Sequence, residues 1–298
     1  MQNNQTENIA IIGLGGKLKA CVELMKLRLS FLVAFSSGFG YILASSNGID
    51  ILILFMLSLG GILVSGASIA INQVIEVEYD AVMTRTKSRP LPTGRLTSNE
   101  AITFAVLCFL TGITLLYFTT NIQTVALSFV SMILYSFVYT PLKRVGPIAV
   151  FVGAIPGALP PLLGWVAATG SISYEALIIF GIQFIWQFPH FWAIAWVADE
   201  DYKKAGFKLL PGGGKKDIQT AINIMIYTLF LIPLGLLPMY FGITGVNSAV
   251  VATICGVLFL AQTFGLMRDY SRKAALKIMY SSFLYLPIVQ VAFLLDKS

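Results

Sequence analysis

Long runs of apolar residues, separated by short polar, glycine-containing or proline-containing segments, follow one another along the chain. A helix needs about 20 predominantly apolar residues to cross the hydrocarbon core of a bilayer. Nine runs meet this requirement by their length and their charged or turn-forming borders. They cover residues 29–46, 51–71, 100–119, 122–140, 147–168, 174–197, 218–239, 245–266 and 277–295. The pattern predicts an all-α integral membrane protein, a bundle of nine transmembrane helices that forms one domain over residues 1–298.

The composition argues against a soluble domain, a nucleic-acid-binding protein and a cysteine-based site. Only 11% of the residues are charged and 57% are hydrophobic, whereas a soluble domain carries about 25% charged residues. The net charge of +6 is not arranged as a basic stripe alternating with aromatic residues, so we exclude nucleic acid as a partner. Cys21, Cys108 and Cys255 lie far apart, which excludes a disulfide framework and a CxxC site.

The basic residues test the number of spans. Lys and Arg accumulate in the cytoplasmic loops of membrane proteins. If the N-terminus lies inside, nine spans place every Lys and Arg except Lys297 on the cytoplasmic side. We therefore expect a multi-pass protein of the plasma membrane, held by the lipid bilayer, with a cytoplasmic N-terminus, cytoplasmic polar loops and an outside C-terminus.

The densest polar motif begins at the end of the second run. Asn72, Glu76 and Asp80 recur every four residues and would form one stripe of oxygen ligands on a helix. Mg²⁺ prefers such ligands and is usually shared with substrate phosphate. Arg85 and Arg89 follow and could pair with phosphate oxygens. The motif is typical of a diphosphate clamp; the competing interpretation is a solvated helix end whose acids and bases pair with each other.

A second acidic group closes the sixth run. Asp199, Glu200 and Asp201 follow one another there and are candidates for a second set of metal ligands. Lys203, in the same segment, is a candidate for binding diphosphate. The glycines at 212–214 lack the spacing of a P-loop, so a loop without nucleotide-binding function is the favoured interpretation.

The sixth run also contains His190, the only histidine of the chain, preceded by Gln183 and Gln187 at helical spacing. A lone histidine inside a membrane is commonly a hydrogen-bonded packing residue, but histidine is also a frequent ligand of haem iron. Eleven residues separate His190 from Asp201, about 16 Å along a straight helix. One helix could therefore reach a macrocycle and a diphosphate together.

The fourth run directs Tyr139 and Lys143 towards the basic side at a four-residue step. These two residues are candidates for the same polar site. The alternative is an aromatic belt with a lysine that extends to the membrane boundary.

The fifth run contains Pro156, Pro160 and Pro161. Proline removes a helix hydrogen bond, and broken helices occur in membranes chiefly where they are buried or line a cavity. The sequence therefore predicts a broken helix in this run.

These motifs resemble the UbiA-type intramembrane prenyltransferase superfamily. The run from Asn72 to Arg95 is similar to its first aspartate-rich motif, in the form used by the haem branch, the protohaem IX farnesyltransferases. Glu76 stands where the general pattern has Asp, which favours that branch, and Asp199 departs from the basic residue expected there. The later motifs follow in the same order: YTPLKR at 139–144, GAIPGALPPLLGW at 153–165, PHFW at 189–192 and EDY at 200–202. The resemblance extends from about Leu24 to Asp296.

The resemblance implies a central cavity, open to the cytoplasmic face, where farnesyl diphosphate and haem b meet. It implies transfer of the farnesyl group to a haem vinyl group with addition of water, giving haem O and diphosphate. A downstream haem-processing enzyme is the further expected partner. The implied site comprises Asn72, Glu76, Asp80, Glu200 and Asp201 around Mg²⁺, with Arg85, Arg89, Tyr139, Lys143 and Lys203 towards the diphosphate and His190 towards haem.

Two alternatives share parts of this pattern. An aromatic-ring, quinone-type polyprenyltransferase would use the same clamp, and identification of the product separates the two. A haem or isoprenoid transporter would also need a polar pocket, but it should show broken helices in both halves of the chain.

Overall fold

The computed structural model describes residues 13–46 and 48–298, and in this part of the chain nine helices are long and apolar enough to cross a membrane. The nine-span prediction is confirmed. The spans are α2 (Leu27–Ala44), α3 (Ile51–Ile75), α5 (Ser98–Thr119), the continuous rod of α6 (Ile122–Ile133), the π-helix η1 (Leu134–Tyr139) and α7 (Thr140–Leu142), α8 (Ile148–Thr169), α9 (Tyr174–Val197), α12 (Ile218–Tyr240), α13 (Val246–Asp269) and α14 (Arg272–Leu295). There are also four short helices. Helix α1 (Leu14–Leu24) precedes the first span, and α4 (Val77–Val82), α10 (Asp199–Lys204) and α11 (Pro211–Gly214) lie between spans.

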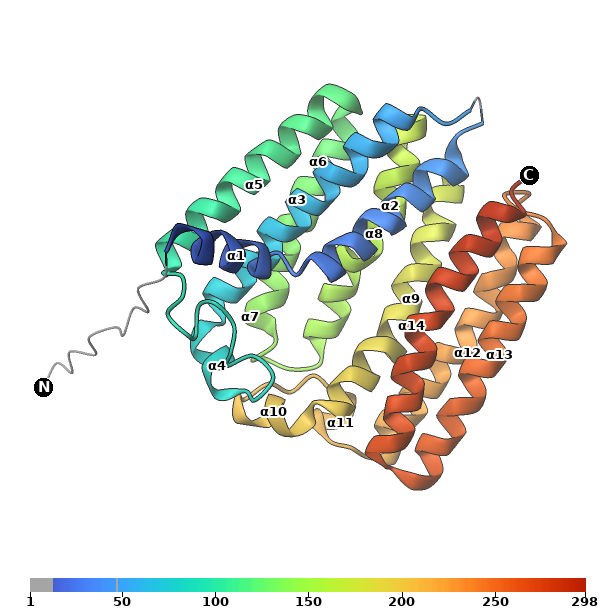
Figure 1. Ribbon diagram of the computed structural model, residues 1–298. Helices are drawn as coiled ribbons and strands as arrows, with labels where there is room; N and C mark the ends of the chain where they lie inside the picture. The colour runs from blue at the N-terminus through green and yellow to red at the C-terminus, as the bar shows by residue number, and fades with distance from the viewer. Residues whose placement is uncertain (1–12, 47) are drawn as a thin grey trace, which may run out of the picture.

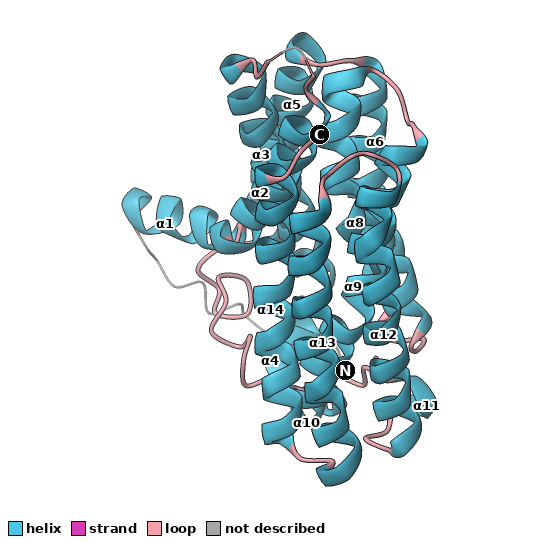
Figure 2. Ribbon diagram, turned by 90° about the vertical axis from the view of Figure 1, so that its right-hand side faces the viewer, coloured by secondary structure: helices cyan, strands magenta, loops and turns pink. Residues whose placement is uncertain are grey.

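The spans pack side by side (Figure 1). Helix α2 packs against α3 and α8, and α9 packs against α8, α12 and α14. Figure 1 shows α4, α10 and α11 at the end of the bundle opposite the C-terminus. Helix α1 projects sideways from the bundle (Figure 2). The two acidic segments found in the sequence therefore lie at the same end.

Side-chain caps set several helix starts. The Thr97 side chain accepts a hydrogen bond from the Glu100 N–H while the Glu100 carboxylate accepts one from the Thr97 N–H, so a capping box begins α5. Ser271 accepts from the Ala274 N–H and begins α14 at Arg272, five residues before the apolar run. Caps act on backbone N–H groups rather than on hydrophobicity, which is why the apolar run alone placed this start too late.

The prediction of a broken fifth span was wrong, because α8 runs without interruption through its three prolines. Pro161 has no N–H to donate to the carbonyl of Gly157. The Gln183 side chain of α9 donates to that carbonyl at 2.8 Å instead, and Gln187 donates to the carbonyl of Ala154 at 2.8 Å. A side chain of a neighbouring helix thus satisfies the carbonyl that Pro161 leaves free, and a second one ties the proline-rich segment to α9.

Glycines let α2 and α8 approach closely. A Cβ atom at Gly164 would lie 1.8 Å from the Ser37 carbonyl oxygen, and one at Gly40 would lie 2.0 Å from the Pro161 carbonyl oxygen. Both obstacles are backbone atoms, which cannot move aside as a flexible side chain can. Small residues at such contacts are typical of helix packing in membranes.

We expect Gly164→Ala to lower the free energy of unfolding by about 3 kcal/mol or more, because its methyl group must displace the backbone of α2. Thermal unfolding of the detergent-solubilised protein measures this. The control is Gly181→Ala on α9, where a Cβ meets nothing within 4 Å. Equal unfolding midpoints for the two variants would contradict the close packing.

Candidate active site

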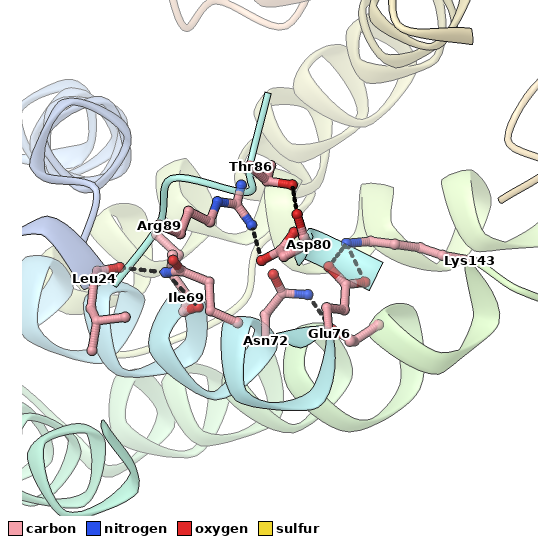
Figure 3. Close-up of polar contacts among 10 residues, drawn as sticks. Leu24, Ile69, Asn72, Glu76, Asp80, Thr86, Arg89 and Lys143 are labelled. Carbon is pink, nitrogen blue, oxygen red and sulfur yellow. Dashed lines mark hydrogen bonds and ion pairs between the residues drawn. The ribbon is translucent and has the colours of Figure 1, made fainter. Parts of the chain in front are cut away.

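The first acidic motif lies across a junction between two helices. Helix α3 ends at Ile75 and α4 begins at Val77, and Glu76 between them has φ −101° and ψ 9°. The helix that carries the predicted stripe is therefore bent at Glu76. The four-residue step survives, since the Glu76 N–H donates to Asn72 O at 3.0 Å and the Asp80 N–H donates to Glu76 O at 2.8 Å. Figure 3 shows the three side chains next to one another, between Arg89 and Lys143.

All three side chains are buried and each has a partner from another part of the chain. Asn72 Nδ2 donates to Thr140 Oγ1 at 2.8 Å. The Lys143 ammonium lies 2.8 Å from Glu76 Oε1 and donates to Oε2 at 3.0 Å. Arg89 donates to Asp80 Oδ2. Glu76 is 3% exposed and Asp80 is 0% exposed. The competing interpretation, a helix end exposed to solvent, therefore does not describe these acid–base pairs.

The second oxygen of Asp80 suits a cation. Asp80 Oδ1 is buried and accepts no hydrogen bond within the described part of the chain. Among residues 13–46 and 48–298, no group of three or more Asp, Glu, His or Cys side chains lies close enough together to hold a metal ion by itself. Mg²⁺ usually takes only one or two carboxylates and leaves its other positions to water and substrate phosphate. A free carboxylate oxygen beside the amide of Asn72 fits that requirement.

Asp201 of the second acidic group connects the two polar segments. Its carboxylate accepts hydrogen bonds from the N–H groups of Thr84 and Arg85, both at 3.1 Å, and from the Lys204 ammonium at 3.0 Å. The Lys204 contact, followed by the two backbone N–H groups, holds the pKa of Asp201 well below its ordinary value. Asp201 is therefore a carboxylate at neutral pH. It contacts the segment that follows α4, through Thr84 and Arg85.

The other residues of the second acidic group have different surroundings. Asp199 is buried and pairs with Lys203 at 2.8 Å and with Lys216 at 3.2 Å. Asp199 raises the pKa of Lys203 by this contact. Glu200 is exposed. Lys216 brings the glycine-containing loop to the same end of the site.

Helix α9 does not continue straight into this segment. It ends at Val197, and Ala198 has φ −96° and ψ 9° before α10 begins. The distance of about 16 Å from His190 to Asp201 assumed a straight helix, and this condition is not met. The bend nearly matches the one at Glu76, so both polar segments turn away from their spans in the same way.

Aromatic rings hold the cations at the edge of the site. The Lys143 ammonium lies 4.7 Å from the centre of the Tyr139 ring, and the Arg85 guanidinium lies 5.8 Å from that of Tyr202. The Tyr139 ring packs over Gly153 of α8, where a Cβ would come within 2.6 Å of it. Tyr139 belongs to the π-helix η1, and such segments are frequent at functional sites.

His190 is buried in an aromatic environment. Its Nδ1 lies 2.8 Å from Ser282 Oγ, and its ring stacks on Trp186 with centroids 4.5 Å apart. Ser282 Oγ donates its only proton to Met279 O at 2.6 Å. Ser282 must therefore accept from His190, which places the proton of the neutral imidazole on Nδ1 and leaves a lone pair on Nε2.

Two residues of the site have no signal in the sequence. Thr140 is a polar residue inside YTPLKR, yet it alone orients Asn72, and it also donates to Tyr135 O at 2.9 Å. Lys26 looks like one more basic residue before the first span, yet it lies in the electrostatic field of Arg85, Arg89 and Lys143. The bond between Asn72 and Thr140 joins segments far apart in the chain.

Solved structures share the fold. A structure concerning digeranylgeranylglyceryl phosphate synthase in membranes superposes with a TM-score of 0.78 at 23% identity, covering 94% of this chain and 98% of that one. A UbiA homologue from Archaeoglobus fulgidus, bound to GPP and Mg²⁺, superposes with a TM-score of 0.62 at 16% identity, covering 92% and 99%.

Sequence relatives are closer. The chain is 51% identical over 284 residues to Protoheme IX farnesyltransferase of Cytophaga hutchinsonii, covering 95% of this chain and 99% of that protein. It is 36% identical to the mitochondrial Protoheme IX farnesyltransferase of Arabidopsis thaliana, covering 97% of this chain and 67% of that protein. The model of the UbiA prenyltransferase family matches residues 32–286. With its fold, its motifs and nearly its whole length in agreement, the chain belongs to the UbiA prenyltransferase family.

Proposed function

We propose that this protein transfers the farnesyl group of farnesyl diphosphate to a vinyl group of haem b, with addition of water, giving haem O and diphosphate. The observation that carries the proposal is the convergence of Asn72, Glu76 and Asp80 with Arg89 and Lys143 in one buried site. Relatives named Protoheme IX farnesyltransferase, up to 51% identical, support haem as the acceptor.

The carboxylates and the amide at the junction of α3 and α4 are the proposed magnesium ligands. Asn72, Glu76 and Asp80 supply oxygens from one side, and Asp201, with Glu200 beside it, supplies them from the second segment. Mg²⁺ bound there would add positive charge against the diphosphate. The A. fulgidus homologue, bound to GPP and Mg²⁺, supports this assignment.

The fixed cations stabilise the leaving group. When the bond between the allylic carbon and the diphosphate oxygen breaks, the electron pair stays on the diphosphate and negative charge grows there. Arg85, Arg89 and Lys143 would meet this charge without reorganising, because their positions are already set by Asp80, Glu76 and the tyrosine rings. Preorganised charge of this kind commonly supplies the largest share of catalysis. Lys203, mostly exposed, is a peripheral contributor to diphosphate binding.

The acceptor end of the site lies on α9. We assign the lone pair of His190 Nε2 to the haem iron, which would orient a vinyl group towards the allylic cation. The vinyl π electrons would form the new carbon–carbon bond, and water would then add to the resulting cation and release a proton, which leaves a hydroxyl group. The aromatic surroundings of His190, with Trp186, Phe191 and Phe283 around the ring, exclude stray water from this step.

The direct test is to incubate the membrane-embedded protein with haem b, farnesyl diphosphate and Mg²⁺ and to analyse the haem by mass spectrometry. We expect a hydroxyethylfarnesyl haem. Prenylation of an added quinone precursor, with haem left unmodified, would establish the quinone-type alternative instead. In the cell we expect the product to pass to a downstream haem-processing enzyme.

We expect Asp80→Asn to lower Mg²⁺-dependent turnover at least about 100-fold, because the variant loses a metal ligand and the charge that holds Arg89. Turnover and the unfolding midpoint should be measured together. Glu78→Gln, which removes an exposed acid from the same short helix, is the matched control and should keep its turnover. Unaltered turnover in Asp80→Asn would refute the clamp.

We expect His190→Ala to weaken haem binding and change its absorbance spectrum, because the iron loses its imidazole. Ser282→Ala should weaken haem binding less, by about 10-fold to 100-fold, because it removes only the partner that orients the ring. Absorbance titration of the purified variants with haem b measures both. An unchanged spectrum and affinity in His190→Ala would remove the proposed iron ligand.

We also propose that the polar end of the bundle faces the cytoplasm of a cell with this protein in its plasma membrane, since every Lys and Arg except Lys297 would then lie inside. Alkaline phosphatase fused after Ser298 should be active, and green fluorescent protein fused there should stay dark. The reverse pattern would invert the orientation.

A further inference from the structure

Phe207 lies between the two polar segments of the candidate active site. It follows α10, where Gly206 has a φ of 72° and the Phe207 N–H donates to the Tyr202 carbonyl at 2.9 Å. Together with the bond from the Gly206 N–H to the Lys203 carbonyl at 3.1 Å, this is the Schellman pattern that ends a helix. The pattern folds the chain back and brings the residue after the glycine against the last turn. Phe207 is 5% exposed, so its ring is buried in this position.

The Phe207 ring contacts one tyrosine from each segment. Its centroid lies 6.1 Å from that of Tyr202 on α10 and 5.6 Å from that of Tyr79 on α4. Aromatic pairs interact favourably at centroid distances of about 4.5–7 Å. Helices α4 and α10 contact each other at this end of the bundle (Figure 1). Phe207 therefore joins the short helix that carries Asp80 to the one that carries Asp201.

Each tyrosine ring in turn holds an arginine. The Arg85 guanidinium lies 5.8 Å from the centre of the Tyr202 ring, and the Arg144 guanidinium lies 4.1 Å from that of Tyr79. Both distances lie within the limit of about 6 Å for a cation–π contact. Five side chains thus form one continuous row, with Phe207 at its centre: Arg144, Tyr79, Phe207, Tyr202 and Arg85. None of the ion pairs among the described residues involves either arginine.

The row matters most for Arg85. The cations at positions 89 and 143 are fixed by salt bridges with buried carboxylates. Arg85 differs, because its backbone N–H, rather than its guanidinium, donates to Asp201. Its guanidinium contacts the Tyr202 ring. The direction of the Arg85 side chain therefore depends on a ring that Phe207 holds from the other side.

We propose that Phe207 is a positioning residue for the prenyl diphosphate: its ring holds Tyr202 in place, and Tyr202 directs the Arg85 guanidinium towards a phosphate oxygen. This inference rests on the proposed function and adds to it a residue that touches neither substrate. A phenylalanine offers no charge or hydrogen bond to a diphosphate, so its effect on binding passes through Arg85. A residue that only stabilised the fold would act independently of Arg85. The two roles therefore differ in how the effects of the two side chains combine.

Binding of Mg²⁺-pyrophosphate to the full-length protein in detergent, measured by calorimetry, tests the proposal in a double-mutant cycle. Phe207→Leu removes the ring and keeps an apolar side chain, and we expect it to raise Kd about 3-fold to 10-fold. Arg85→Gln should raise Kd about 10-fold to 100-fold, because a charged partner of the phosphate is lost. In the Arg85→Gln background, Phe207→Leu should raise Kd by less than about 2-fold further.

Two further variants serve as controls. Phe207→Tyr keeps the ring and should restore binding to within about 2-fold of the wild type. Phe264→Leu makes the same exchange at an exposed phenylalanine of α13 and should bind like the wild type. The unfolding midpoint is measured for every variant. If Phe207→Leu does not fold, Tyr202→Leu takes its place in the cycle and Tyr202→Phe takes the place of Phe207→Tyr, under the same criteria.

Wild-type affinity in Phe207→Leu would overturn the proposal. An equal rise in Kd from Phe207→Leu with and without the Arg85 guanidinium would also overturn it, because the two side chains would then act independently. Unchanged affinity in Arg85→Gln has the same consequence. If the cycle gives the expected result yet the wild-type protein forms no farnesylated haem, the proposed function fails while this inference stands.

Discussion

The burial of two acid–base pairs at one end of a membrane bundle is the constraint on which the site depends. Removing charges from water costs more than a single ion pair commonly returns, and apolar residues of similar size would often stabilise a fold as well. Glu76 with Lys143, and Asp80 with Arg89, are therefore better understood as stored charge for a ligand than as a source of stability. In the proposed function, Mg²⁺ and the diphosphate would bind together, and both partners of each pair would then gain a second counterpart.

Two similar bends carry this chemistry to the membrane boundary. Glu76 follows α3 and Ala198 follows α9, with nearly equal backbone angles, and each bend turns a short polar helix away from its span. Asp201 then holds the N–H groups of Thr84 and Arg85, so the chain after α4 and helix α10 contact each other over the polar end.

The spans beneath the site are held by polar contacts as well as by close packing. Ser36, Gln183 and Gln290 form a closed set of hydrogen bonds of 2.8–2.9 Å that joins α2, α9 and α14. Gln183 also donates a hydrogen bond to the Gly157 carbonyl of the proline-rich helix α8. Because α9 is fixed to four neighbouring helices, the segment that bears His190 has a defined position relative to the clamp.

The sequence by itself determined the nine spans, because a bilayer requires long apolar runs. It also predicted the residue types of the proposed clamp, because a magnesium-bound diphosphate requires oxygen ligands beside bases. It could not determine how these residues pair. The bond from Asn72 to Thr140 and the salt bridge from Glu76 to Lys143 join segments that are distant in the chain. It also failed at the prolines of α8, because membrane helices tolerate proline where a neighbouring helix can satisfy a freed carbonyl. Gln183 supplies that donor from another helix, and only the tertiary structure brings the two together.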